Sequence, residues 1–272
     1  MDGIDIIYWI NLPKSKERRA YMKNILADEA FDGIVNERVD GTDGIKNVKK
    51  LHEKLHLDKM DFMSRNLQVT SKEYACTLSH LEAIRKFSLT DYTHAIILED
   101  DISLEYKKYW NETLKEVMND APKDWEILKI QRAPYSMKEE SNKKYKLWDF
   151  SYRYNEKFPK DEWWRRITGD WGAAAYIINN VAAKKLIKNI YKNGKYVLKD
   201  NLPHFADAFL FKMLKTYIYK YPFFTPRKNN DTNIQPGKST RCREKVMDEM
   251  YKRMTRKNKK AAKQTKKRKS KN

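Results

Sequence analysis

The segment AIILEDDI, residues 95–102, constrains the fold of this chain more than any other feature. A short apolar run typical of a buried strand is followed at once by Glu99, Asp100 and Asp101. Clustered carboxylates that are even half-buried oppose folding unless cations or hydrogen-bond donors accompany them. A divalent metal ion is the functional explanation of such a strand end. Taken alone, however, the cluster is more typical of a solvated acidic turn or of the first turn of the next helix.

The apolar patterns before this segment alternate between strand and helix. They predict a strand at 4–10, a helix at 16–31, a strand at 34–39 closed by Asp40 and Gly41, polar segments over 45–69, and a helix to Ser88 that Thr70 and Glu73 open with a capping box. A strand, helix and strand in succession are typical of a parallel sheet.

The same alternation continues in the second half of the chain. It predicts a helix around 107–119, a strand at 125–130, a surface excursion over 135–168, a strand at 172–178, a helix at 180–191 with Gly194 as its stop, and a helix from about 206 to 219. The chain is therefore expected to form an α/β fold.

Positive charge is concentrated at the end of the chain. The net charge is +20, and residues 252–272 alone carry twelve Lys or Arg and no acid. We expect one folded domain over 1–240, followed over 241–272 by a basic amphipathic segment and a disordered tail. Such a tail suits an anionic membrane surface, an acidic partner or nucleic acid, and a purely solvating appendage is the alternative.

The remaining composition limits the class of protein. Two cysteines, Cys76 and Cys242, lie far apart and give neither a disulfide framework nor the ligand spacing of a zinc site. The first residues, MDGIDIIYWINL, carry acids where a signal peptide carries bases, and no apolar run is long enough to span a membrane. The sequence therefore predicts a cytoplasmic protein with no transmembrane segment.

Several segments stand in an order that matches one known enzyme family. They are IIYWINLPKSKERRAYM at the start, VDG at 39–41, EYACTLSH at 73–80, AIILEDDI, DWEILKI at 124–130, AAAYIINNVAAKKLI at 173–187 and ADAFL at 206–210. Together they resemble glycosyltransferase family 25, which includes lipooligosaccharide and procollagen galactosyltransferases. Two departures are Ala75, where the family usually has glycine, and DTNI at 231–234 in place of its later Ser-Asp-Ile element.

The resemblance covers roughly residues 4–235 and implies both a fold and an activity. The fold is of the GT-A type, a Rossmann-like, open and mostly parallel sheet flanked by helices. The activity is transfer of a hexose, galactose or glucose, from a UDP-sugar to a hydroxyl of a saccharide or protein acceptor, with inversion and with a divalent ion such as Mn²⁺. Ligands of open parallel sheets bind at the carboxyl ends of the strands, where the acidic cluster would lie.

The resemblance also assigns residues to the donor site. Asp101 is the expected metal ligand, with Asp100 or Glu99 assisting. Asn11 and Arg18 would contact the nucleotide, Asp40 its ribose side, and Ser79 and His80 are expected binding residues without a proton-transfer role. The alternatives are a solvated helix residue for Arg18, an ordinary Asp-Gly turn for Asp40 and a packed structural histidine for His80.

Asp207 is the candidate base that deprotonates the acceptor hydroxyl, because it lies in the otherwise apolar stretch FADAFLF. A helix-capping role is the alternative, and Asp170 is the reserve candidate. His204 is a possible further metal ligand, and Trp163, Trp164 and Trp171 could stack on an acceptor. Two other functions stay open: a nucleic-acid-binding protein that uses the tail, and an inactive family member that only binds sugar nucleotides.

Overall fold

The computed structural model describes residues 1–57, 69–110, 112–131, 148–150, 172–198, 204–219 and 222–227, together with residue 252. Within these residues the dominant element is a seven-stranded sheet. In spatial order its strands are β2 (Val35–Asp40), β1 (Ile6–Asn11), β4 (His94–Glu99), β8 (Ala175–Asn179), β6 (Ile127–Lys129), β11 (Thr216–Tyr219) and β7 (Trp148–Phe150). Only β8 and β7 run against the others, so the expected open and mostly parallel sheet is confirmed.

The apolar strands are buried on both faces of this sheet. In β1, Ile6 and Tyr8 face one core cluster, whereas Ile7 and Trp9 face another. The strand β4 divides in the same way, because successive side chains of a strand point to opposite faces. Near-continuous apolar runs such as these are typical of a parallel sheet covered by helices on both sides.

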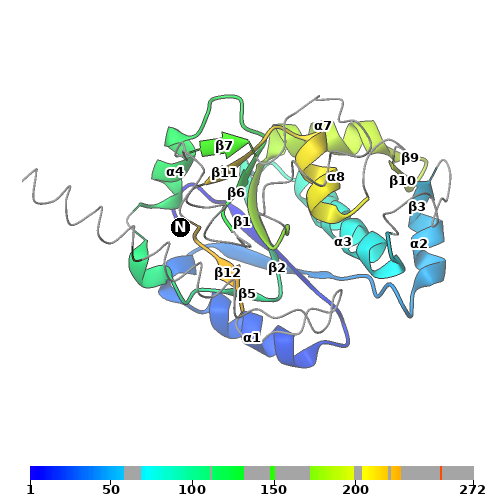
Figure 1. Ribbon diagram of the computed structural model, residues 1–272, viewed down its shortest axis with the longest axis horizontal. Coiled ribbons are helices and arrows are strands. Elements are labelled where there is room, and N and C mark those ends of the chain that lie inside the picture. The colour runs from blue at the N-terminus through cyan, green and yellow to red at the C-terminus, as the bar shows by residue number, and fades with distance from the viewer. Residues whose placement is uncertain are drawn as a thin grey trace, which may run out of the picture.

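Helices cover each face (Figure 1). The first cluster is completed by α2 (Val48–Lys54), α3 (Ser71–Ser88), α7 (Asn180–Ile190) and α8 (Ala206–Met213). The second is completed by α1 (Lys16–Leu26), the 3₁₀ turn η1 (Glu29–Phe31) and α4 (Leu114–Asp120). A further 3₁₀ turn, η2, spans Lys107–Tyr109. None of the helices in the described part of the chain has the length and apolar character needed to span a bilayer.

The helix α3 begins as the sequence predicts. The side chain of Thr70 accepts a hydrogen bond from the amide of Glu73, and the carboxylate of Glu73 accepts one from the amide of Thr70 at 2.6 Å. This capping box satisfies two amides that the first helical turn leaves without partners. It fixes the start of the helix that carries Cys76, Ser79 and His80.

Two small sheets lie beside the main one. One contains β3 (Leu55–Leu57), β10 (Lys195–Leu198) and β9 (Tyr191–Lys192), and the other pairs β12 (Thr225–Pro226) with β5 (Ile102–Ser103). Gly194 was expected to stop a helix, but it instead forms the turn between β9 and β10 with Asn193. Both residues have positive φ, 50° for Asn193 and 80° for Gly194, as a two-residue hairpin turn requires.

Three predicted helices are shorter than expected. The helix expected around 107–119 is replaced by η2 and, after a break, the short helix α4. The helix expected over 16–31 ends at Leu26, and η1 follows it. The helix expected from about 206 to 219 ends at Met213, and the residues Thr216–Tyr219 form β11. Their β-branched and aromatic side chains suit a strand, and β11 pairs with β6 and β7. Apart from β7, the excursion at 135–168 lies outside the described residues, as does the segment 241–272 apart from residue 252.

Candidate active site

The carboxyl ends of β1 and β4 bring Asn11 next to the acidic turn. The two strands are parallel neighbours with Ile10 paired to Glu99, so Asn11 and Asp100 follow at the same edge. Asn11 is 1% exposed and Asp100 is 6% exposed. The side-chain amide of Asn11 donates hydrogen bonds to Asp100 Oδ2 at 2.7 Å and to the carbonyl of Ser15 at 3.2 Å. Asn11 therefore fixes the orientation of the Asp100 carboxylate.

Arg18 reaches the same carboxylate from α1. Its Nη1 lies 2.6 Å from Asp100 Oδ1 and 3.6 Å from Asp101 Oδ2. Although burial favours the neutral guanidine, the charges of Asp101 and Asp100 outweigh it and raise the pKa of Arg18 above its ordinary value. Both oxygens of Asp100 are thus engaged by protein groups, and Arg18 stays charged beside Asp101.

Asp101 lies in a cluster of carboxylates whose charge the described residues balance only in part. Burial, followed by the nearby charge of Glu99, raises the pKa of Asp101 to about 7 despite the opposing effect of Arg18. Among the described residues, Arg18 is the guanidinium that contacts this cluster, and Arg19 and Arg38 donate to Asn11 beside it. A carboxylate oxygen is a ligand that hard divalent ions prefer. The donor set and the excess of negative charge therefore fit a divalent ion at Asp101.

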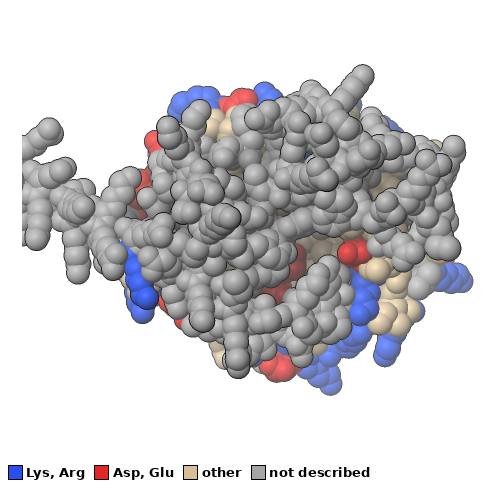
Figure 2. Space-filling model, in the orientation of Figure 1, with Lys and Arg blue, Asp and Glu red and all other residues tan. Residues whose placement is uncertain are grey.

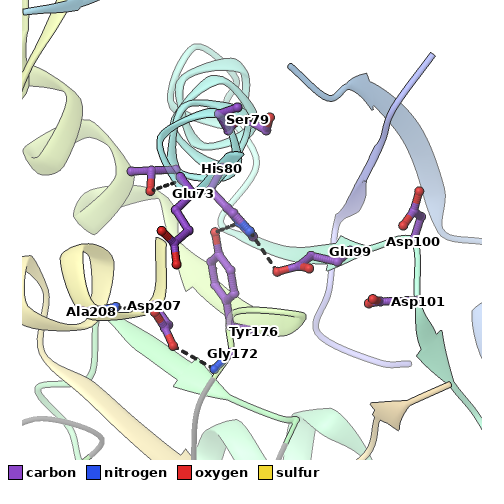
Figure 3. A network of polar contacts seen from close by, with 12 residues as sticks. Glu73, Ser79, His80, Glu99, Asp100, Asp101, Gly172, Tyr176, Asp207 and Ala208 are labelled. Carbon is purple, nitrogen blue, oxygen red and sulfur yellow. Dashed lines mark hydrogen bonds and ion pairs between the residues drawn. The ribbon is translucent and has the colours of Figure 1, made fainter. Parts of the chain in front are cut away.

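Glu99 points away from Asp100, toward α3. Its Oε1 lies 3.2 Å from Nε2 of His80, and Nδ1 of His80 lies 3.1 Å from the hydroxyl of Tyr176. Figure 3 shows Glu99 and Asp101 directed to the same side, with Tyr176 between His80 and Asp207. His80 is fully buried, so its ring orientation is fixed by Tyr176 on one side and Glu99 on the other.

Ser79 and Asp40 occupy different positions near this edge. Ser79 donates to the carbonyl of Ala75 at 2.7 Å and accepts from the amide of Thr42 at 2.9 Å, so it ties α3 to the loop after β2. Asp40 ends β2 opposite Asn11 and pairs with Arg38 at 2.5 Å. Ser79 therefore holds the loop after β2 in place, whereas Asp40 is exposed at the edge of the sheet.

Asp207 lies in the first turn of α8, across Tyr176 from the acidic strand (Figure 3). Its Oδ2 accepts a hydrogen bond from the amide of Gly172 at 2.9 Å, and its Oδ1 accepts one from the amide of Ala208 at 2.8 Å. The cap position itself is Phe205, which makes no side-chain capping bond. The carboxylate therefore joins the start of α8 to the residues before β8.

His204, the possible further metal ligand, contacts α3. Its Nδ1 lies 3.0 Å from the hydroxyl of Tyr74, and its carbonyl accepts a hydrogen bond from Thr77 at 2.5 Å. The reserve base Asp170 and the three tryptophans Trp163, Trp164 and Trp171 lie outside the described residues.

Sequence reasoning missed two side chains beside Glu99. Cys76 lies one helical turn before His80, and the ligand atoms of Cys76, His80 and Glu99 all lie within 4.8 Å of one another. Tyr176 is fully buried in β8, where an aromatic residue in an apolar run suggests core packing. The indication was the four-residue spacing of Cys76 and His80, which places both on one helical face.

The face of the molecule shown in Figure 2 has acidic atoms recessed near its middle. Basic side chains gather along the lower rim of the same face. Basic side chains attract an anionic ligand, and acidic atoms attract a cation. The arrangement therefore suits an anionic ligand that binds together with a cation.

Comparison with known proteins identifies the family of this chain. The model of glycosyltransferase family 25 (LPS biosynthesis protein) matches residues 4–202. Procollagen galactosyltransferase 2 of Mus musculus is 30% identical over 144 residues, which are 50% of this chain and 22% of that protein. The Homo sapiens protein of the same name is 30% identical over 142 residues, again 50% of this chain and 22% of the relative. The family match spans well over half of the sequence, so this chain belongs to glycosyltransferase family 25.

Proposed function

We propose that the protein is a metal-dependent hexosyltransferase. It takes galactose or glucose from a UDP-sugar and transfers it, with inversion, to a hydroxyl of a saccharide or protein acceptor. The two relatives are procollagen galactosyltransferases, which favours galactose as the sugar, and the association of the family with LPS biosynthesis favours a saccharide acceptor.

The observation that carries this proposal is the unbalanced charge of Asp101. It lies at the carboxyl edge of a parallel sheet, the edge where open α/β sheets bind their ligands. Asp101 would hold Mn²⁺, and Glu99, which is directed to the same side, would assist it (Figure 3). When bound, the ion supplies positive charge that stabilises the diphosphate leaving group.

The neighbouring residues would orient this centre and bind the nucleotide. Asn11 and Arg18 hold Asp100, which keeps the backbone of the acidic turn in place. The charge of Arg18 also attracts a diphosphate toward Asp101. Asp40, exposed at the end of the adjacent β2, would accept hydrogen bonds from the ribose.

Asp207 would act as the general base. Two backbone amides fix its carboxylate, and it faces the acidic strand across Tyr176 (Figure 3). A base in this position would take the proton of the acceptor hydroxyl as the bond between sugar and diphosphate breaks. The resulting hydroxyl oxygen then bonds to the sugar carbon, and UDP leaves.

A panel of UDP-sugars tests the proposal with the whole chain. Each donor is incubated with a saccharide or a hydroxylysine-containing peptide acceptor, with Mn²⁺ or with a chelator, and UDP release and product mass are measured. We expect turnover with one hexose donor that the chelator and Asp101→Asn both abolish. Full activity of Asp101→Asn at limiting Mn²⁺ would remove the metal role of Asp101, and donor binding without turnover on any acceptor would indicate an inactive member of the family.

A further inference from the structure

A second cluster of metal-ligating side chains lies beside the acidic turn. Cys76 and His80 are four residues apart on α3 and so share one face of the helix, and Glu99 approaches them from the end of β4. Their ligand atoms lie within 4.8 Å of one another. These residues come from two elements of the buried core, and this rigid support limits how far the ligands can separate.

The separations suit a tetrahedral ion. Nε2 of His80 and Oε1 of Glu99 are 3.2 Å apart. Two ligands at zinc-to-nitrogen and zinc-to-oxygen distances of about 2.0–2.1 Å are separated by about 3.3 Å in a tetrahedron. The sulfur of Cys76, within 4.8 Å of both, would need to approach by about 1 Å to complete three corners. The fourth corner would be left for water or another ligand.

Tyr176 supplies the outer contact that metal-binding histidines commonly have. Nδ1 of His80 lies 3.1 Å from the Tyr176 hydroxyl, and both side chains are fully buried. If Nδ1 carries the proton and donates it to Tyr176, the lone pair of Nε2 faces the carboxylate of Glu99, and a cation between them removes the repulsion. In the other tautomer Nε2 donates to Glu99, and no ion is needed.

The chemistry of the cluster differs from that of Asp101. Burial raises the pKa of the Cys76 thiol well above its ordinary value, so a bound ion would have to displace the thiol proton. The thiolate formed in this way, a neutral imidazole and a carboxylate would together carry two negative charges, which a divalent ion cancels. Sulfur and imidazole ligands favour Zn²⁺, whereas oxygen ligands favour Mg²⁺ and Mn²⁺.

We propose that Cys76, His80 and Glu99 form a second divalent-cation site, of the zinc-binding type, separate from the oxygen site at Asp101. The site goes beyond the proposed sugar transfer, since it concerns a different ion held by Cys76 and His80, and in it Glu99 turns toward His80 and leaves Asp101 as the carboxylate of the Mn²⁺ site. Tyr176 is its positioning residue, because its hydroxyl orients the ring of His80 without touching the ion.

Cobalt substitution tests this site without an activity assay. The whole chain is titrated with Co²⁺, whose bond to a thiolate gives a near-ultraviolet charge-transfer absorption. We expect this absorption to saturate at one equivalent and to be lost on addition of Zn²⁺ but not of Mn²⁺. Cys76→Ser should abolish it, and the matched control Cys242→Ser should retain it. Tyr176→Phe should keep the absorption but weaken Co²⁺ binding by about 10–100-fold.

Two further measurements complete the test. Asp101→Asn should keep the absorption, and its loss there would show a single shared ion and overturn the second site. Zn²⁺ should slow the alkylation of Cys76 in the wild-type protein, as located by mass spectrometry, and this result needs no variant to fold. No thiolate absorption in the folded wild type, or an absorption that survives Cys76→Ser, would also overturn the proposal. Neither result depends on whether the protein turns over a UDP-sugar.

Discussion

The guanidinium of Arg18 and the carboxylate of Asp100 are in contact at 2.6 Å, although the two residues are 82 positions apart in the sequence. Both side chains are largely buried, with 13% and 9% of their surfaces exposed. The pair joins α1 to the turn after β4 and leaves Asp101, the next residue, beside the same guanidinium at 3.6 Å. The position of the proposed metal ligand therefore depends on an ion pair that also stabilises the fold.

Arg18→Ala should destabilise the protein by about 3 kcal/mol, because it leaves the buried charge of Asp100 without its partner. Urea denaturation at neutral pH measures the free energy of unfolding. Lys16→Ala, an exposed change on the same helix, is the control and should alter stability by less than about 0.5 kcal/mol. Equal effects of the two variants would contradict a structural role for the pair.

Asp101→Asn should stabilise the metal-free protein at pH 8 by about 2 kcal/mol. Because the folded-state pKa of Asp101 is raised to about 7, the wild type has the stabilising effect of the protonated form at low pH and loses it as the pH rises through 7. The asparagine is neutral throughout, so the difference in unfolding free energy should grow from pH 5 to pH 8. Urea denaturation in the presence of a chelator measures this difference at pH 5 and at pH 8.

Mn²⁺ should make the wild type more stable than Asp101→Asn at pH 8, which reverses the order expected without metal. An ion bound to the wild type offsets the charge of Asp101 and raises the midpoint of thermal unfolding, whereas Asp101→Asn should show little shift. The shift in the wild type should be smaller at pH 5, where the ion must displace a proton. A metal-induced shift of the same size in both proteins would place the ion elsewhere.

The sequence predicted the elements whose local and long-range preferences agree. The strands β1 and β4 have distinctive apolar patterns and also occupy buried positions that suit them. The capping box at Thr70 depends only on contacts within the first turn of α3, so it can be predicted from local sequence alone. The helix expected to continue to 219 was wrong because Thr216–Tyr219 pair with strands from distant parts of the chain. A local sequence pattern cannot predict this pairing, because the partner strands are distant in the sequence.

The sequence predicted several of the residues that lie near the acidic turn, but it did not predict which of them contact one another. The acidic cluster indicated a counter-charge, and Arg18 and Asn11 were among the expected residues. Which carboxylate they bind depends on the register of β1 against β4, which pairs Ile10 with Glu99. The alternation of side chains along the chain then puts Asp100, held by protein groups, on the other side from Glu99 and Asp101 (Figure 3).

Gly44→Ala should destabilise the protein by at least about 2 kcal/mol through overpacking. A Cβ at this position would collide with the carbonyl of Ser71 and lie 2.6 Å from the Cα of Lys72, so the loop after β2 could not stay against the start of α3. Thermal unfolding of this variant is compared with that of Lys46→Ala, an exposed change in the same loop, which should behave as the wild type. An unchanged Gly44→Ala protein would mean that the loop moves away at little cost.

Asp43→Asn should lower the free energy of unfolding at neutral pH and have little effect on it near pH 2. The ion pair with Lys14, at 2.6 Å, lowers the pKa of Asp43 from 3.8 to about 2. The contribution of this carboxylate is therefore present above 3.8 and is lost as the pH falls through 2. Lys14 is half exposed, so we expect less than about 1 kcal/mol. Denaturation of both proteins across this range measures the difference, and a constant difference would exclude a charge effect.

Asp207→Asn should lower kcat by about 10²–10⁴-fold while donor binding is retained. The amide oxygen of asparagine can still accept a hydrogen bond from Gly172 or Ala208, so the start of α8 should keep its place, but the side chain can no longer take a proton. Single-turnover kinetics separate transfer from UDP-sugar binding, and Asp91→Asn, on the surface, is the control. If Asp207 serves only to begin the helix, thermal stability and donor affinity should fall together with the rate, whereas a base should leave both near their wild-type values.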